Sequence, residues 1–198
     1  MNNVAIEQGG AIYYDFRRPE IIDTNFTNND AAYGSNIASY PVRIVQDDSV
    51  NDNIELTDVV SGIKYSTKLK LSIVDYDDQV MNLVNSSLIK ITPVTEGAVL
   101  KGTDSSTLVM GQTEFDNLQF EHYPGATDTE YIASCDLIDS DKTAYLDLPT
   151  NDTITVSFRF CKPGEAIIDN STCSPCNAGT YSLTWNSTEC LSCMDNAI

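Results

Sequence analysis

The sequence is short of positive charge, and this shortage excludes one class of partner. Of its 198 residues, 11 are Lys or Arg and 29 are Asp or Glu, which gives a formal net charge of −18. Proteins that bind nucleic acid rely on Lys and Arg side chains to neutralise phosphates. We therefore exclude nucleic acid as a partner of this chain.

Histidine is equally scarce, since His122 is the only one in the sequence. Nucleophilic catalysis by a triad or dyad needs a base within reach of the nucleophile. The stretch EHYPG around His122 contains a Pro-Gly turn signal, which predicts a histidine on a surface loop. We predict that the chain is not an enzyme.

The sequence also lacks long apolar runs. No segment reaches about 18 consecutive apolar residues, the length that spans a bilayer. The start MNNVAIEQGGAI lacks the basic and apolar regions of a signal peptide. The chain is thus either cytosolic or a piece of a longer protein, and any membrane contact belongs to parts of the parent chain outside this sequence.

Asn-x-Ser/Thr sequons favour a piece of a longer, secreted protein. Such sequons carry N-linked glycans only when a chain enters the secretory pathway. About three would arise by chance in a sequence this rich in Asn, Ser and Thr, so the five present are a modest excess. The sequons lie at Asn25, Asn85, Asn151, Asn170 and Asn186.

The start of the chain combines short strand patterns with turn residues. The apolar stretch GGAI occupies residues 9–12, and residues 21–27 are predicted to form a β-branched strand with Asn25 on its solvent face. Asn28 and Asn29 follow this strand and suit tight turns. An ordinary β-hairpin with polar turns is one interpretation of this pattern.

GGAI followed by FTNN resembles the GGA[ILV] and FxxN repeat of right-handed β-helices of the polymorphic outer-membrane-protein type. The extension to AYGSNIASYP is similar to the end of such a helix in large cell-surface proteins of ciliated protozoa. The resemblance implies that residues 1–41 form the terminal coils of a right-handed parallel β-helix. Because each coil packs on its neighbours, further coils must come from upstream or from another chain.

Some β-helices are polysaccharide lyases or hydrolases, so a carbohydrate-active enzyme is the enzymatic alternative. Its site needs paired carboxylates or basic residues collected from several successive coils. The residues available on barely two coils are Asp15, Arg17, Arg18, Glu20 and Asp23. A solvated polar rim is the better interpretation of these side chains.

Residues 42–160 show the alternation of half-buried antiparallel strands. It is clearest in KLKLSI (residues 68–73) and TITVSFRF (residues 153–160). Further strands are predicted at residues 54–59, 88–91, 107–110, 114–120 and 130–135. Turn signals separate several of these strands, which favours a β-sandwich of about seven strands.

GQTEFDNLQFEHYPGAT (residues 111–127) resembles immunoglobulin-like repeats of extracellular adhesins and filamin-type rods, which implies an Ig-like sandwich.

Five of the six cysteines lie in residues 161–198, with the spacing C-x11-C-x2-C-x13-C-x2-C. The two C-x-x-C pairs are close to the spacing of a zinc ribbon, but a zinc ribbon leaves Cys161 without a role, whereas a ladder of disulfide loops uses it. The sequons Asn170 and Asn186 lie inside these loops. Disulfides are therefore favoured over zinc.

The same segment resembles the ephrin-receptor-like, or GCC2/GCC3, cysteine-rich repeat, which is itself similar to tumour-necrosis-factor-receptor modules. The resemblance implies that Cys161 pairs with Cys173 and Cys176 with Cys190, although the sequence alone leaves the connectivity open. The matching residues are Cys173, Cys176, Gly179, Thr180, Tyr181, Ser182, Cys190 and Cys193.

Two cysteines fall outside this pairing. We expect Cys193 to form a disulfide with a residue just past Ile198, which again favours a piece of a longer chain. Cys135 lies on a predicted strand and is either a buried free thiol or an alternative partner of Cys161.

Acidity makes calcium the one plausible ion. QDDSVNDN (residues 46–53) is similar to the DxNDN linker of cadherins, and a second set of carboxylates lies at residues 75–78. Calcium takes hard oxygen ligands of this kind. The spacing differs by one residue from the cadherin pattern, so solvated acidic residues at a domain boundary are favoured. We predict no cofactor.

The sequence thus predicts an all-β chain with terminal β-helix coils (1–41), an Ig-like antiparallel β-sandwich (42–160) and a GCC2/GCC3-like cysteine-rich repeat (161–198). We expect a structural or adhesive module of a large extracellular glycoprotein at the cell surface, which self-associates or binds other surface glycoproteins in filaments or a coat. The alternative is a ligand-binding receptor ectodomain, suggested by the cysteine-rich repeat alone.

Overall fold

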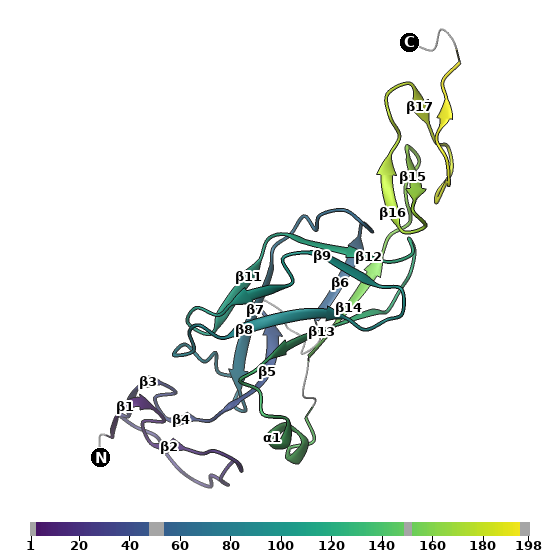
Figure 1. The fold of residues 1–198 in the computed structure, drawn as a ribbon. Coiled ribbons are helices and arrows are strands. Elements are labelled where there is room, and N and C mark those ends of the chain that lie inside the picture. The colour runs from purple at the N-terminus through teal and green to yellow at the C-terminus, as the bar shows by residue number, and fades with distance from the viewer. Residues whose placement is uncertain (1–2, 48–53, 149–151, 195–198) are drawn as a thin grey trace.

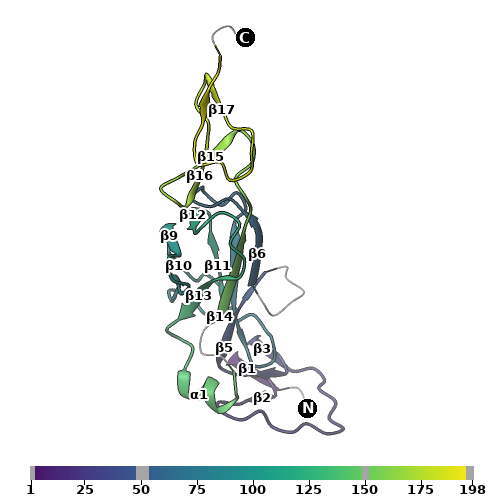
Figure 2. The same ribbon diagram turned by 90° about the vertical axis from the view of Figure 1, so that its right-hand side faces the viewer.

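The computed structural model describes residues 3–47, 54–148 and 152–194. It is all-β apart from a short helix, α1 (Ser140–Tyr145), which confirms the predicted class. The molecule is elongated, with its two termini at opposite ends and the larger sheets between them (Figures 1 and 2).

The first strands pair in parallel. β1 (Val4–Gln8) lies beside β3 (Asp30–Tyr33), and β2 (Ile12–Tyr13) lies beside β4 (Ile37–Ala38). Val4 is opposite Asp30, 26 residues apart, and after a register shift Gln8 is opposite Tyr33 and Ile12 is opposite Ile37. From Gln8 onward, equivalent positions are therefore 25 residues apart. We call β1 with β2 the first coil and β3 with β4 the second coil.

Both coils turn at a glycine with a positive φ angle, +66° at Gly9 and +57° at Gly34. A Cβ atom at Gly9 would lie 2.6 Å from the Ile12 carbonyl oxygen, and one at Gly34 would lie 2.3 Å from that of Ile37. Only glycine fits such a left-handed turn against its own backbone. The two coils therefore repeat the same local geometry.

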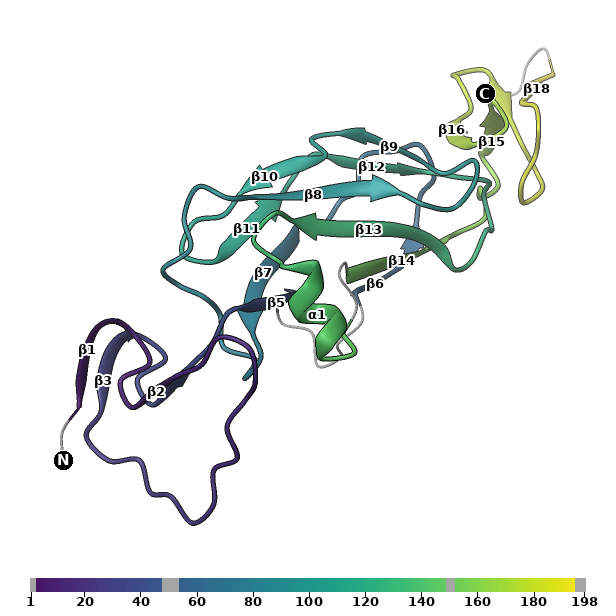
Figure 3. The same cartoon turned by 60° about the horizontal axis from the view of Figure 1, so that its bottom comes forward.

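The strand predicted at residues 21–27 is wrong. This segment forms no strand and runs as a long irregular loop between the coils (Figure 3). Asp23 and Asn28 have positive φ angles, which interrupt extended backbone, and Ile22 is 66% exposed. An alternating pattern without a partner strand gains no ladder hydrogen bonds, so it does not fix a strand here.

The middle of the chain forms three sheets, and the main apolar core lies between them. We call them the central sheets. One has the strand order β10-β8-β13-β14-β6, a second has the order β11-β7-β5, and a third pairs β12 with β9. The strands are β5 (Pro41–Gln46), β6 (Ile54–Val59), β7 (Leu69–Asp75), β8 (Leu88–Pro93), β9 (Val99–Gly102), β10 (Ser105–Thr107), β11 (Gln112–Phe115), β12 (Leu118–Glu121), β13 (Thr129–Cys135) and β14 (Asp152–Phe158).

Alternation explains which faces are buried. Leu69 and Leu71 on β7 are 1% and 0% exposed, whereas Lys70 between them is exposed. The structure confirms, to within a few residues, the strands predicted at residues 54–59, 68–73, 88–91, 130–135 and 153–160. They are β6, β7, β8, β13 and β14. Their aliphatic side chains form a single apolar cluster that also contains Phe120 and Tyr131.

Other strand predictions failed where the period of two breaks. Residues 114–120 contain parts of two strands, β11 and β12, which belong to different sheets. Phe115 and Leu118 are both buried although they are three positions apart. A single strand with a period of two would place them on opposite faces. Of residues 107–110, only Thr107 belongs to a strand, β10, whereas Val109 forms an isolated bridge with Gln112 and Met110, with φ +52°, lies in the turn between them. No prediction covered β5, β9 or α1, although β5 is as long as β6.

The last part of the chain has short strands and almost no apolar core. β15 (Glu165–Ile168) pairs with β16 (Thr172–Pro175), and β17 (Thr180–Tyr181) pairs with β18 (Leu191–Ser192). Disulfides join Cys161 to Cys173 and Cys176 to Cys190, the pairing that the receptor-type resemblance implies. Each closed loop restricts the unfolded chain by about 3 kcal/mol on the loop-entropy model.

Asp152, the first residue of β14, is a partly buried carboxylate that is expected to weaken the fold at neutral pH. Its Oδ2 accepts a hydrogen bond from the Ile44 N–H at 2.5 Å. Burial raises the pKa of Asp152 to about 6, although that hydrogen bond and the charge of Arg43 oppose the rise. A folded pKa above the unfolded value means that folding favours the protonated form, so the fold gains stability as pH falls through 6.

We predict that Asp152→Asn stabilises the protein at pH 7.5 by about 1–3 kcal/mol, because the amide keeps an oxygen acceptor and removes the charge. Denaturant unfolding at pH 7.5 and pH 4 measures the effect, which should shrink towards zero at the lower pH. Asp116→Asn, at an exposed position, is the control for a change in net charge. Equal effects of both substitutions at pH 7.5 would contradict the prediction.

Candidate functional site

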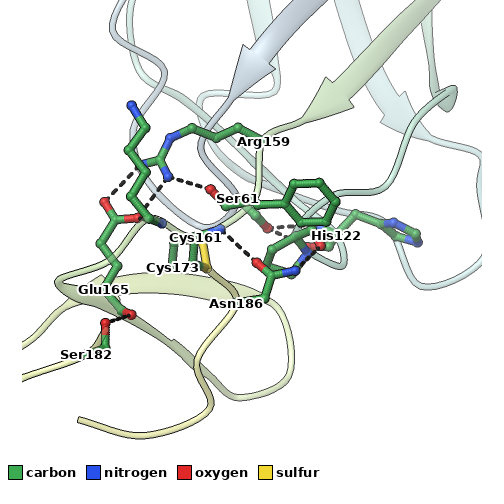
Figure 4. The surroundings of a disulfide bond; sticks show 11 residues. Ser61, His122, Arg159, Cys161, Glu165, Cys173, Ser182 and Asn186 are labelled. Carbon is green, nitrogen blue, oxygen red and sulfur yellow. Dashed lines mark hydrogen bonds and ion pairs between the residues drawn. A yellow bond between two sulfur atoms is a disulfide. The ribbon is translucent and has the colours of Figure 1, made fainter. Parts of the chain in front are cut away.

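The boundary between the central sheets and the cysteine-rich segment is a connected set of contacts, which we call the carboxy-terminal junction. Its centre is the Cys161–Cys173 disulfide, whose two residues are 0% and 1% exposed. The Cys173 N–H donates to the Ser61 carbonyl at 3.1 Å. Figure 4 shows this disulfide with Asn186 on one side and Arg159 and Glu165 on the other.

Asn186 fastens the cysteine-rich segment to a loop of the central sheets. Its Oδ1 accepts a hydrogen bond from the Cys161 N–H at 2.8 Å, and its Nδ2 donates to the Pro124 carbonyl at 3.1 Å. Its own N–H donates to the Cys161 carbonyl at 2.9 Å. A single side-chain amide thus links segments more than 60 residues apart in the sequence.

Arg159 and Glu165 form a bidentate ion pair across the same junction. The guanidinium Nη1 and Nη2 atoms each lie 2.8 Å from a Glu165 carboxylate oxygen. The side chains are only 11% and 21% exposed, so water screens the pair less than it would at an open surface. The hydrogen bond from Arg159 lowers the pKa of Glu165, against the opposing effect of burial.

Glu121 joins the junction from the end of β12. Its carboxylate accepts a hydrogen bond from the Ser171 hydroxyl and pairs with Lys101. Burial alone would raise the pKa of Glu121, but the contacts with Lys101 and Ser171 together lower it. Because the folded pKa of both Glu121 and Glu165 lies below the ordinary value, their stabilisation is present at neutral pH and is lost in acid.

At the other boundary, the amino-terminal junction, a buried carboxylate fastens the coils to β7. Asp75 is 0% exposed. Its Oδ1 accepts from the N–H groups of Asp77 and Gln79 at 2.9 and 3.0 Å, and its Oδ2 accepts from the Ser39 N–H at 3.1 Å. These donors compensate the cost of burying the charge.

Asp77 adds a second contact at the amino-terminal junction. It accepts hydrogen bonds from the Tyr14 hydroxyl at 2.6 Å and from Arg18 Nε at 2.7 Å. Burial, followed by the hydrogen bond to Asp77, raises the pKa of Tyr14 above its ordinary range. Helix α1 makes a third contact, since the rings of Phe16 and Tyr145 lie 4.7 Å apart.

Side chains of the central sheets also cover one edge of the coils. Gln79 Nε2 donates to the Ile37 carbonyl at 2.9 Å, and Asn82 Nδ2 donates to the Ala32 carbonyl at 3.3 Å. The backbone groups that the second coil presents on this side are therefore partly satisfied by side chains. We call this the capped edge.

The first coil presents the opposite, open edge. Within the pair of coils, the Gly10 N–H donates to the Gly34 carbonyl and the Ile12 N–H to the Asn36 carbonyl. By the 25-residue repeat, the equivalent acceptors on the first coil are the carbonyls of Gly9 and Ala11. No residue in the described part of the chain donates a hydrogen bond to either carbonyl.

Apolar side chains lie beside this open edge. On β1, Val4 is 75% exposed and Ile6 is 93% exposed. An edge strand with unpaired backbone groups and exposed apolar side chains is a template for pairing with another strand. The open edge is therefore the surface of the coils best suited to bind a partner.

The residues of the enzymatic alternative take part in structural contacts. Arg18 pairs with Asp77, and Asp15 pairs with Lys142 of α1. His122 lies beside Glu96, whose carbonyl is 3.2 Å from the imidazole Nε2. Arg17, Arg18 and Glu20 line one open hollow of about 490 Å³, which neither Asp15 nor His122 lines.

The residues considered for metal binding are also engaged. Asp77 and Asp78 pair with Arg18 and Arg43, and most of residues 46–53 lie outside the described part of the chain. Three of the four cysteines of the two C-x-x-C pairs are in disulfides, whereas Cys193 is exposed and Cys135 is buried, and neither forms a disulfide within the described residues.

The sequons differ in their surroundings. Asn25, Asn85 and Asn170 are exposed, Asn186 is half-buried, and Asn151 lies outside the described residues. Sequence reasoning marked Asn186 only as a glycosylation site and missed its hydrogen bonds. It also missed the Arg159–Glu165 pair, for which the one signal was opposite charges on either side of Cys161.

Comparison of the sequence with models of known protein families gives no match, and none of the curated proteins searched matches it. Within residues 3–47, 54–148 and 152–194, no helix is long and apolar enough to cross a membrane.

Glu165→Gln is expected to loosen the carboxy-terminal junction while the central sheets stay folded, because the amide weakens the pairing with Arg159. Amide hydrogen exchange at Cys173 and Asn186 should speed up by an amount equivalent to about 1–2 kcal/mol at pH 7. Because the pKa of Glu165 lies below the ordinary value, the two proteins should converge only in acid strong enough to protonate wild-type Glu165.

Glu189→Gln, at an exposed position of the same segment, is the matched control. Unchanged exchange in Glu165→Gln at pH 7 would show that the ion pair does not hold the junction.

Proposed function

We propose that this chain is a non-catalytic structural module of a large extracellular glycoprotein, in which the open edge of the coils is an assembly surface. The contrast between the two coil edges carries the proposal. One edge is covered by Gln79 and Asn82, whereas the other leaves backbone acceptors and two apolar side chains open. An uncovered edge is a liability for aggregation, so further coils, from upstream in the parent chain or from another chain, would cover it.

The parallel pairing of the coils supports the interpretation that residues 1–41 form the terminal part of a right-handed β-helix, as the GGAI and FTNN motifs imply. Their supporting features are the 25-residue repeat and the equivalent turns at Gly9 and Gly34. The orders β11-β7-β5 and β10-β8-β13-β14-β6 are compatible with an Ig-like sandwich, in which a split first strand contributes to both sheets. The disulfide pairing supports the GCC2/GCC3-like repeat.

The disulfides support an extracellular or cell-surface location. Both stabilise a segment whose buried apolar side chains are few, so the segment depends on conditions that keep its cysteines oxidised. Such conditions prevail outside the cytosol. The high negative charge keeps the module soluble there.

We propose that the open edge is covered either by further coils upstream in the parent chain or by a second copy of this chain, and the second copy is the alternative that this chain can test directly. Because the other edge is capped, stacking of one copy's first coil on the next copy's second coil is blocked. Two open edges can instead meet about a two-fold axis, which closes at two copies. A filament or coat then requires a second contact elsewhere in the parent protein. The alternative function, a receptor ectodomain, instead predicts saturable binding of a different partner.

Replacing Val4 and Ile6 together by Lys is expected to abolish pairing of two copies, because four added charges would face one another across the two-fold axis. Sedimentation velocity at rising protein concentration measures the pairing. Val109→Lys with Met110→Lys adds the same charge at exposed positions of the turn before β11, outside the coils, and is the matched control. A wild-type chain that stays monomeric at every concentration would refute self-association through this edge.

A further inference from the structure

A hollow of about 460 Å³ lies at the carboxy-terminal junction, lined by Phe160, Trp185 and Asn186. We propose that this aromatic hollow holds the first N-acetylglucosamine of a glycan attached to Asn186. The inference rests on the proposed extracellular glycoprotein, and it goes further by assigning one sequon a glycan with a fixed position and a structural role.

The hollow is built from both sides of the junction. Phe160 follows β14 and packs on the loop of the central sheets, since a Cβ atom at Gly125 would lie 2.2 Å from the Phe160 ring. Trp185 belongs to the cysteine-rich segment. The two residues are 53% and 59% exposed, which leaves large aromatic surfaces uncovered where two segments meet.

Asn186 lies at the rim of this hollow in a held orientation. Its amide is fixed by the Cys161 N–H on one side and the Pro124 carbonyl on the other. The sequence continues with Ser187 and Thr188, which completes the sequon, and Thr188 is exposed. The sequon therefore identifies the occupant of the hollow, because the sugar would be bonded to Asn186, one of the residues that line the hollow.

Glycosylation is compatible with the hydrogen bonds of Asn186. The transfer forms a bond between Nδ2 and C1 of the sugar, breaks the bond from C1 to the phosphate of a lipid-linked sugar pyrophosphate, and passes one Nδ2 proton to that leaving group. The product amide keeps one N–H to donate to the Pro124 carbonyl and keeps Oδ1 to accept from Cys161. Transfer to the unfolded chain, followed by folding, gives the arrangement without steric conflict at a formed junction.

The chemistry of the hollow suits a sugar. A pyranose ring has an apolar face of C–H groups and a rim of hydroxyls, so one side packs on aromatic rings while the other stays hydrated. Aromatic surface removed from water contributes free energy roughly in proportion to its area. The first sugar would cover Phe160 and Trp185 together and so add a contact across the junction.

Trp185 is the only tryptophan in the chain, so its fluorescence reports directly on this hollow. The full chain would be secreted from a eukaryotic host and trimmed with an endoglycosidase that leaves a single N-acetylglucosamine on each occupied sequon. It would be compared with Thr188→Val, which removes the sequon hydroxyl but keeps Asn186. Thr188→Ser, which preserves the sequon, is the matched control.

We expect peptide mass spectrometry to find the sugar on Asn186 in the wild type and in Thr188→Ser. The trimmed wild type should show emission at shorter wavelength and roughly twofold weaker acrylamide quenching than Thr188→Val. Amide exchange of β7 and β13 in both variants would show that the central sheets are folded.

The possible results separate this inference from the proposed function. An occupied Asn186 with the same fluorescence as Thr188→Val would refute packing of the sugar in the hollow. An empty Asn186 beside occupied Asn25, Asn85 or Asn170 would overturn the inference and leave the glycoprotein proposal standing. If no sequon carries a glycan, both fail.

Discussion

Neither end of this chain buries enough apolar surface to fold by itself, and this constraint organises the whole structure. The two coils enclose little beyond Tyr14, Tyr33 and Ala38, and the cysteine-rich segment buries little beyond its own disulfide and Ala166. Both are fastened to the central sheets, which contain nearly all of the apolar cluster. The contacts at the two junctions, together with Tyr33 and Ala38, which join the apolar cluster of the central sheets, therefore hold the two ends in place.

The two junctions solve this problem with different chemistry. At the amino-terminal junction a buried carboxylate, Asp75, gathers N–H donors from the coils and from its own turn. At the carboxy-terminal junction the Cys161–Cys173 disulfide lies within the cysteine-rich segment, and the Cys173 N–H, Asn186 and the Arg159–Glu165 pair make the contacts to the central sheets. A reducing environment would thus threaten only the end that contains the disulfides, whereas the amino-terminal junction relies on hydrogen bonds, ion pairs and a ring contact.

The two proposals give polar residues at these boundaries a second role. On the proposal for the open edge, the side chains that cover one coil edge leave the other edge for strand pairing. On the proposal for Asn186, a residue that fastens the junction also carries a sugar that shields it. Both ideas follow from the same requirement, because exposed backbone and aromatic surface at a module boundary must be covered by something.

The sequence by itself determined the all-β class, the buried faces of strands such as β7 and β14, and the concentration of cysteines at one end. These features depend on alternation and composition, which are local. Only the tertiary structure decided that residues 21–27 form a loop, that Phe115 and Leu118 belong to different sheets, and that Asn186 reaches Pro124. Each of these depends on contacts between residues far apart in the chain, and no local pattern in a single sequence records which distant groups will meet.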